Sequence, residues 1–241
     1  VIEEPLVDVA IFRQNTEGLY GGVEWSNPPD DVYNAFLTHP RFVKNFKHVP
    51  KDELSISTRI FTRKATERIL RAAFGHAKKY GYKSVTVCEK PNVIRETSGM
   101  MYKLAQEIQR NDYPGIELWN TNIDAQMMWL TKNPEDYGVI VAGNMFGDIL
   151  SDEASVISGS IGLLASASIG IHTAMFEPIH GSYPQAKGKN IANPLAAILS
   201  AAMLLDHFEL FEESEEIRTA VEKSIELNIT TPDLNSTNHF S

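Results

Sequence analysis

The chain has 241 residues, of which 43% are hydrophobic and 22% are charged, and its formal net charge is −9 at pH 7. This composition is typical of a globular protein with a substantial core, in one large domain or two smaller ones. The acidic balance argues against a nucleic-acid-binding surface. No apolar run is long enough to span a membrane and no signal peptide is evident, so we expect a cytoplasmic protein.

A single cysteine, Cys88, excludes an internal disulfide and suits a reducing compartment. It lies in the apolar run 84–88, which predicts a buried, inert thiol. The chain starts at Val1 rather than at a methionine and stops at Ser241 without a tail. We interpret both ends as cut from a longer chain.

The hydrophobic pattern predicts strands and helices in alternation along most of the chain. Helices are favoured by caps at Thr62 and Asn193 and by a stop at Gly81. This order of elements predicts a mainly parallel sheet with helical crossovers. Strands are expected at 7–12, 54–61, 84–88, 116–119, 138–142 and 174–178. Helices are expected at 62–80, 95–111, 195–207 and 215–227. A short helix is also expected to end at about residue 132, and another helix to begin after residue 143.

Residues 25–52 contain four prolines among polar and aromatic residues, which argues against one regular element. Two interpretations are open on composition alone. The stretch is either an excursion that clasps a partner or a long surface loop.

Asp148 and Asp152 stand four residues apart after the apolar strand 138–142, so a helix would place both carboxylates on one face. A hard divalent cation such as Mg²⁺ or Mn²⁺ suits ligands of this kind. A solvated helix face is the alternative. The small-residue run 158–168 follows, and it could let a cofactor or another backbone approach closely.

Other polar residues also follow predicted strands, where functional groups gather in α/β proteins. Arg13, Lys90 and Asp124 each stand at such a position. Each one alone is typical of a solvated strand end or a helix cap. Together they indicate a site, which spacing alone does not define.

Five motifs lie in order over nearly the whole chain, at residues 13–20, 90–92, 122–124, 143–163, and 177–182 with 191–194. Together they resemble the isocitrate/isopropylmalate dehydrogenase family of β-decarboxylating dehydrogenases. The resemblance implies an α/β, two-domain fold with a mainly parallel sheet, here incomplete. Residues 1–158 would form a small domain with an intersubunit clasp at about 25–60, and 159–241 would form part of the large cofactor-binding domain.

The resemblance also implies a metal-dependent oxidative decarboxylation of a small hydroxy acid. Asp148 and Asp152 would hold Mg²⁺ or Mn²⁺ together with Asp124 of a second subunit, which requires a homodimer with shared active sites. Lys90, also from the partner, would act with Asp124 to take the proton of the substrate hydroxyl. Tyr20 would protonate the carbon left after loss of CO2.

Substrate and cofactor residues follow from the same resemblance. Arg13 would pair with a substrate carboxylate, and Asn15 would also bind the substrate. The sequence Gln-Ala-Lys at 185–187 has neither the Asp usual in NAD enzymes nor the Lys-Tyr pair of bacterial NADP isocitrate enzymes, and we favour NAD over NADP. The cofactor-binding residues would be Asn92, Glu177, His180, Gly181, Gln185 and Asn193.

Substrate identity is the least defined feature. Residues 15–17 and the long connection from Tyr20 to Lys90 resemble isocitrate enzymes, so we favour oxidation of isocitrate to 2-oxoglutarate, a step of the tricarboxylic acid cycle. Residues 152–155 and 180–182 resemble isopropylmalate enzymes, which keeps 3-isopropylmalate, homoisocitrate and tartrate as alternatives. Gln14 stands where the family commonly has Glu, which would remove a charge beside the site. A non-catalytic regulatory subunit of a heteromeric dehydrogenase is a further alternative.

Overall fold

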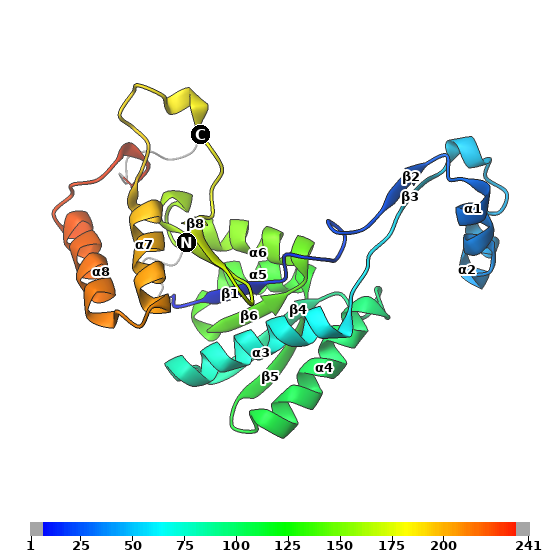
Figure 1. Ribbon diagram of the computed structural model, residues 1–241, viewed down its shortest axis with the longest axis horizontal. Coiled ribbons are helices and arrows are strands. Elements are labelled where there is room, and N and C mark those ends of the chain that lie inside the picture. Colours follow the sequence, from blue (N-terminus) through cyan, green and yellow to red (C-terminus); the bar gives the residue numbers. More distant parts are fainter. Residues whose placement is uncertain (1–6, 235–241) are drawn as a thin grey trace. The chain divides into compact units, whose positions relative to one another are not determined.

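The computed structural model describes residues 7–234, which form two compact units. The first unit runs to Ser151 and the second begins at Asp152, so the division falls inside one helix, α6 (Asn144–Ile157). No helix in the described range is long and apolar enough to cross a bilayer. Each unit is described by itself below (Figure 1).

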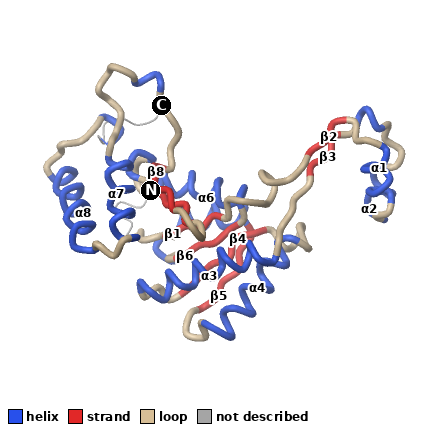
Figure 2. The backbone as a smooth tube through the Cα atoms, in the orientation of Figure 1, coloured by secondary structure: helices blue, strands red, loops and turns tan. Residues whose placement is uncertain are grey.

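The first unit is built on a four-stranded parallel sheet, as the sequence predicts (Figure 2). In spatial order its strands are β1, β6, β4 and β5. Because all four run in the same direction, their carboxyl ends meet at one edge of the sheet. The strands are β1 (Ala10–Arg13), β6 (Val139–Ala142), β4 (Ser84–Glu89) and β5 (Glu117–Asn122).

Two helices, α3 (Arg63–Tyr80) and α4 (Thr97–Asp112), pack on one face of this sheet (Figure 1). The core there includes the fully buried side chains of Leu70, Phe74 and Val87. Helix α5 (Ile123–Lys132) packs against β4 and β5. The thiol of Cys88 is buried as predicted, and burial raises its pKa to about 12.

Helix α3 has the ends that the sequence predicts. The Thr62 hydroxyl accepts a hydrogen bond from the backbone N–H of Ala65, which satisfies one of the free donors of the first turn. Gly81 adopts a left-handed conformation with φ of 77°, and this conformation favours glycine.

Residues 24–57 fold into an arm rather than a long loop, so the surface-loop interpretation is wrong. An antiparallel ribbon carries two helices whose aromatic rings pack together, with ring centroids of Phe36 and Phe42 5.2 Å apart. The strand expected at 54–61 is shorter because only three of its residues pair with the opposite strand. The arm contains β2 (Glu24–Ser26), α1 (Asp30–Leu37), α2 (Pro40–Phe46) and β3 (Ser55–Ser57).

The second unit packs helix α7 (Leu195–His207) against an antiparallel ribbon of β7 (Ala165–Ile169) and β8 (Ala174–Pro178). Part of the small-residue run therefore forms strand β7, which its Ala-Ser composition did not predict. Helix α8 (Phe211–Glu226) packs on α7 and starts earlier than predicted. Its first turn is fixed by Ser214, whose buried hydroxyl donates to the carbonyl of Ala202 on α7.

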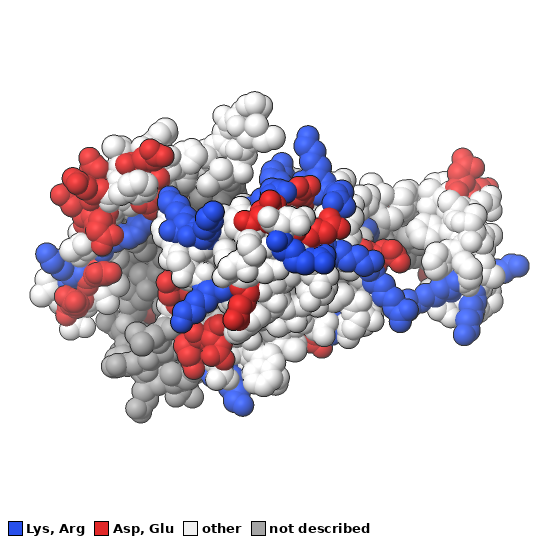
Figure 3. Space-filling view, turned by 90° about the horizontal axis from the view of Figure 1, so that it is seen from below, with Lys and Arg blue, Asp and Glu red and all other residues white. Residues whose placement is uncertain are grey.

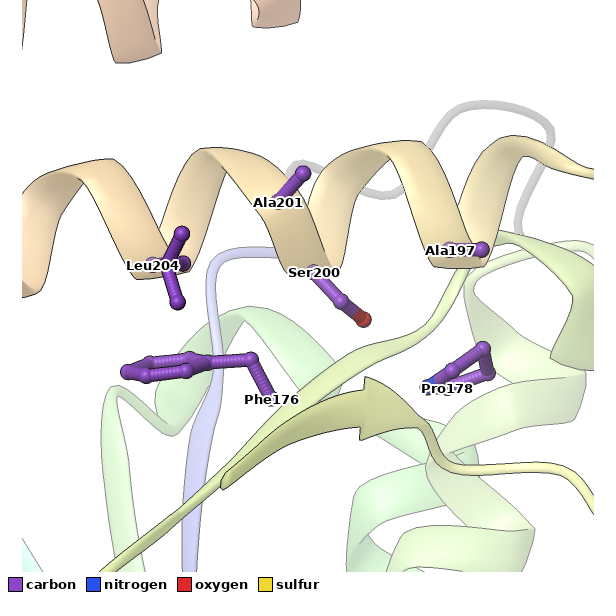
Figure 4. Close-up of a pocket in the computed structure, with 6 residues that line it drawn as sticks. All are labelled: Phe176, Pro178, Ala197, Ser200, Ala201 and Leu204. Atoms are coloured by element: carbon purple, nitrogen blue, oxygen red, sulfur yellow. The ribbon is translucent and has the colours of Figure 1, made fainter. Parts of the chain in front are cut away.

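A crevice of about 260 Å³ separates β8 from α7 (Figure 4). Phe176 and Pro178 line it on the β8 side and Leu204 on the α7 side. The polar group of Ser200 already donates to the carbonyl of Ala196, 2.8 Å away. The rest of the lining is apolar, and none of the predicted site residues belongs to it.

Candidate active site

One group of predicted site residues gathers where β1 ends and α6 begins. The guanidinium of Arg13 forms an ion pair with the carboxylate of Asp148, and its Nε donates to Asn144 Oδ1 at 2.9 Å. The hydroxyl of Tyr20 donates to the other carboxylate oxygen of Asp148 at 3.0 Å. Arg13 and Tyr20, predicted to bind and protonate the substrate, thus contact one predicted metal ligand.

The loop that carries Tyr20 is shaped by Gln14, whose side chain is buried. Its carbonyl oxygen accepts from the backbone N–H groups of Thr16 and Glu17, both at 3.0 Å, and its amide donates to the Thr16 hydroxyl. The carboxylate of Glu17 in turn accepts two hydrogen bonds from Thr62 at the start of α3. A neutral amide at position 14 therefore organises the loop.

The predicted substrate residue Asn15 lies on the same loop. Its side chain is exposed, and its main-chain carbonyl accepts from the Asn144 side chain at 3.2 Å. This contact fixes the loop against the first turn of α6.

A second group lies where β4 and β5 end. Lys90 follows β4 and forms an ion pair with Asp124 in the first turn of α5. The hydrogen bond from Lys90 lowers the pKa of the Asp124 carboxyl, and the start of a helix also favours a negative charge. Asn92, predicted to contact the cofactor, is exposed in the turn that follows.

The predicted metal ligands do not meet within one chain. Asp148 and Asp152 are one turn apart on α6, and Asp152 is exposed. Among residues 7–234, no three His, Cys, Asp or Glu side chains are grouped so as to hold a metal ion. The two α6 carboxylates have the chemistry that Mg²⁺ or Mn²⁺ requires, and a third ligand from another chain is compatible with this arrangement.

The predicted cofactor residues of the second unit lie on or after β8. Glu177 is exposed on β8, and Gln185 is exposed in the short 3-10 helix Pro184–Ala186. A ring nitrogen of His180 lies 2.9 Å from the carbonyl oxygen of Gly181.

Both polar atoms of the Asn193 side chain form hydrogen bonds. Its oxygen accepts from the N–H of Leu195, the first residue of α7, and its amide donates to Asp233, both at 2.9 Å. The N-cap position itself is occupied by Pro194, one residue later than predicted. Asp233 also accepts from the Ser160 hydroxyl at 2.6 Å. Burial by itself would raise the pKa of Asp233, but these hydrogen bonds lower it overall. Asp233 has no signal in the local sequence, because its partners Ser160 and Asn193 lie far from it along the chain.

Charge is mixed on the displayed face of the molecule, where basic and acidic side chains lie interspersed (Figure 3). Exposed ion pairs on and between α3 and α4 join Arg63 with Glu107 and Arg71 with Glu67 and Asp112. Pairs of this kind on exposed helices contribute little to stability individually.

The model of the isocitrate/isopropylmalate dehydrogenase family matches residues 1–241. The chain belongs to this family. The resemblance inferred from the sequence, with the α/β fold that it implies, is confirmed.

Individual relatives of this dehydrogenase family carry different substrate names. A 3-isopropylmalate dehydrogenase of Archaeoglobus fulgidus is 41% identical over 95% of the chain and 63% of the relative. A homoisocitrate dehydrogenase of Methanocaldococcus jannaschii is 41% identical over 95% of the chain and 58% of the relative. The crystal structure of isocitrate dehydrogenase from Methylococcus capsulatus has a TM-score of 0.83 and 36% identity, over 96% of the chain and 63% of that structure.

The chain spans about three fifths of the length of these relatives. Relatives named for 3-isopropylmalate thus stand beside one named for homoisocitrate and a solved structure named for isocitrate.

Proposed function

We propose that this protein is a subunit of a metal-dependent dehydrogenase that oxidises and decarboxylates a 2-hydroxy acid with a carboxylate at the β position. The observation that carries the proposal is the arrangement of two groups along one sheet edge, Arg13, Tyr20 and Asp148 on one side and Lys90 with Asp124 on the other. We take 3-isopropylmalate as the favoured substrate, because relatives named for it are 41% and 39% identical to the chain. Homoisocitrate follows, and isocitrate, which residues 15–17 favoured, is now an alternative. NAD is favoured over NADP because Gln185 can hydrogen-bond ribose hydroxyls but would not neutralise a 2′-phosphate.

The roles of the side chains follow from their chemistry. A bound divalent cation would supply Lewis-acid polarisation of the substrate hydroxyl. Lys90, held by Asp124, would take the hydroxyl proton. Tyr20 would deliver a proton to the substrate carbon after CO2 has left, and Arg13 would bind a substrate carboxylate through its planar fork.

A homodimer is part of the proposal, since Lys90 and Asp124 would serve the site of the neighbouring subunit. Helix α5, which carries Asp124, also exposes the large apolar side chains of Met128 and Trp129. Exposed apolar groups on one helix suit a subunit interface. The arm at 24–57 would be the clasp between subunits.

The test is a spectrophotometric assay of the full-length protein with Mn²⁺, with NAD or NADP, and with each of the candidate hydroxy acids. We expect NADH formation that depends on the metal and is fastest with 3-isopropylmalate. Metal-dependent turnover with none of these acids would refute the proposal. An active homodimer isolated without other subunits would eliminate the regulatory-subunit alternative, which loses support because Tyr20, Lys90, Asp124, Asp148 and Asp152 are all present.

The metal assignment has its own prediction. Asp152→Asn should weaken Mn²⁺ binding at least about tenfold, since a neutral amide replaces a charged ligand, and should lower turnover with it. Manganese affinity is measured by electron paramagnetic resonance, and the fold by circular dichroism. Asp136→Asn, an exposed position near β6, is the matched control. Equal Mn²⁺ affinity in the two variants would contradict the assignment.

A further inference from the structure

Glu89, the last residue of β4, carries a fully buried carboxylate. It lies on the same face of the strand as Val85 and Val87, which belong to the hydrophobic core. A buried carboxylate is costly unless it is paired and hydrogen-bonded. The groups that pair with Glu89 therefore show how its buried charge is compensated.

Three donors satisfy the Glu89 carboxylate. Oε2 accepts from Arg59 at 2.7 Å and from the Ser98 hydroxyl at 2.6 Å, and Oε1 accepts from the backbone N–H of Gly143 at 2.8 Å. The Arg59 side chain is 13% exposed and also donates to the Ser98 oxygen at 2.9 Å. These donors come from three segments that are distant in sequence.

The Arg59 guanidinium is also held by aromatic rings. Its central carbon lies 4.5 Å from the ring centroid of Phe61 and 5.0 Å from that of Phe146 in α6. Cation–π contacts of this kind are strongest when the cation is withdrawn from water, as it is here. Contacts to Arg59 and contacts to Glu89 therefore both hold the ion pair in place.

Each contact adjoins one of the two groups of the candidate site. Lys90 directly follows the buried carboxylate, and its backbone N–H donates to the Ser98 oxygen at 3.3 Å. Gly143 directly precedes Asn144, which accepts from Arg13. One buried ion pair therefore fixes the end of β4 and the start of α6 in relation to each other.

We propose that Arg59 and Glu89 are positioning residues that hold Lys90 and the start of α6 at a fixed separation. The inference rests on the proposed function of Lys90 as a proton acceptor. Buried ion pairs contribute little net stability compared with apolar side chains of similar size, whereas loss of one partner leaves an uncompensated charge. The role of this pair is therefore to fix the backbone positions of Lys90 and of the start of α6.

Two variants and one control test the pair. Ser98→Ala removes the hydroxyl that joins Glu89 to the backbone of Lys90 and leaves the ion pair intact, so the fold should be retained. Glu89→Gln replaces one carboxylate oxygen with an NH2 group. This group would face the Arg59 guanidinium in one orientation of the amide and the backbone N–H of Gly143 in the other. Glu107→Gln is the control, because it removes the acidic partner of Arg63 in an exposed pair between α3 and α4.

The first readout does not depend on turnover. The folded full-length protein is treated with acetic anhydride at one pH, and the rate of Lys90 acetylation is followed by peptide mass spectrometry. Lys90 is held by Asp124, and a displaced backbone should loosen this contact. We expect acetylation at least about threefold faster in Ser98→Ala and Glu89→Gln, with no change in Glu107→Gln.

The second readout is kinetic. We expect kcat to fall at least about tenfold in Glu89→Gln, while KM for hydroxy acid and cofactor changes less than about threefold, since positioning affects the reacting geometry more than binding. If Ser98→Ala folds and Lys90 acetylation and kcat both match the control, the proposal is overturned. If the wild-type protein shows no metal-dependent turnover but acetylation changes as expected, the proposed function fails and the positioning role stands.

Discussion

At Gly143 the main chain passes so close to its neighbours that a side chain would collide with them. An added Cβ would lie 2.5 Å from Glu89 Oε1 and 2.8 Å from Phe61 Cζ. Both neighbours are fixed, since Glu89 is buried and Phe61 contacts Arg59. A glycine is therefore required here for close approach rather than for an unusual backbone conformation.

Gly143→Ala should destabilise the protein by about 1–3 kcal/mol, because the added methyl must displace buried side chains. Gly99→Ala is the matched control, since a Cβ at that position of α4 meets nothing within 4 Å. There we expect no loss, or a gain of up to about 1 kcal/mol from helix propensity. Urea unfolding followed by circular dichroism measures both. Equal stability of the two variants would contradict the steric argument.

Helix α3 shows how one element combines local and tertiary determinants. Its ends are set by Thr62 and Gly81, and its buried stripe by Leu70 and Phe74. Near its C-terminal end, His76 packs among the rings of Phe12, Tyr80 and Tyr82. His76 is thus a half-buried titratable group at the contact between α3 and the sheet.

Burial, followed by the nearby charge of Lys79, lowers the pKa of His76 from its ordinary value of 6.5, although Asp8 opposes the shift. The unfolded chain therefore binds a proton at a higher pH than the folded chain does. Stability should fall as the pH drops below about 6.5, since protonation favours the unfolded state.

His76→Phe should reduce this loss, and His48→Asn, at an exposed position after α2, should not. Urea unfolding midpoints at pH 7.5 and pH 5.5 give the comparison. An identical pH dependence in wild type and His76→Phe would show that this residue has no part in it.

On the scale of the whole molecule, the candidate site is divided between two places on one chain. Asp148 and Arg13 lie at the β1–β6 side of the sheet edge, and Lys90 and Asp124 lie at the β4–β5 side. In the proposed homodimer each active site combines one group from each subunit. This arrangement predicts complementation between inactive variants.

Lys90→Met and Asp148→Asn should each abolish turnover in the full-length protein. In a mixed dimer one site would contain both defects and the other neither, so a randomly mixed sample should recover about a quarter of the wild-type activity. Activity is measured after the two variants are unfolded and refolded together. Variants refolded separately and then pooled are the control, and activity no higher than in that control would refute the shared site.

Elements with local signals could be predicted from the amino-acid sequence. Thr62 and Gly81 predicted the ends of α3, the apolar runs predicted β4 and β6, and the alternation of elements predicted a parallel sheet. The five motifs predicted the family. Cys88 was expected to be buried because its neighbours in the strand are apolar.

Features that depend on a partner from another segment became visible in the folded chain. Strand β3 is short because β2 offers three residues to pair with, and the stretch expected as an excursion or loop folds into an arm with two helices. Glu89 lies one residue beyond the strand expected at 84–88, and the structure extends that strand to include it. Its partners, Arg59, Ser98 and Gly143, come from other segments, because a buried charge takes its hydrogen bonds from whatever the fold brings to it.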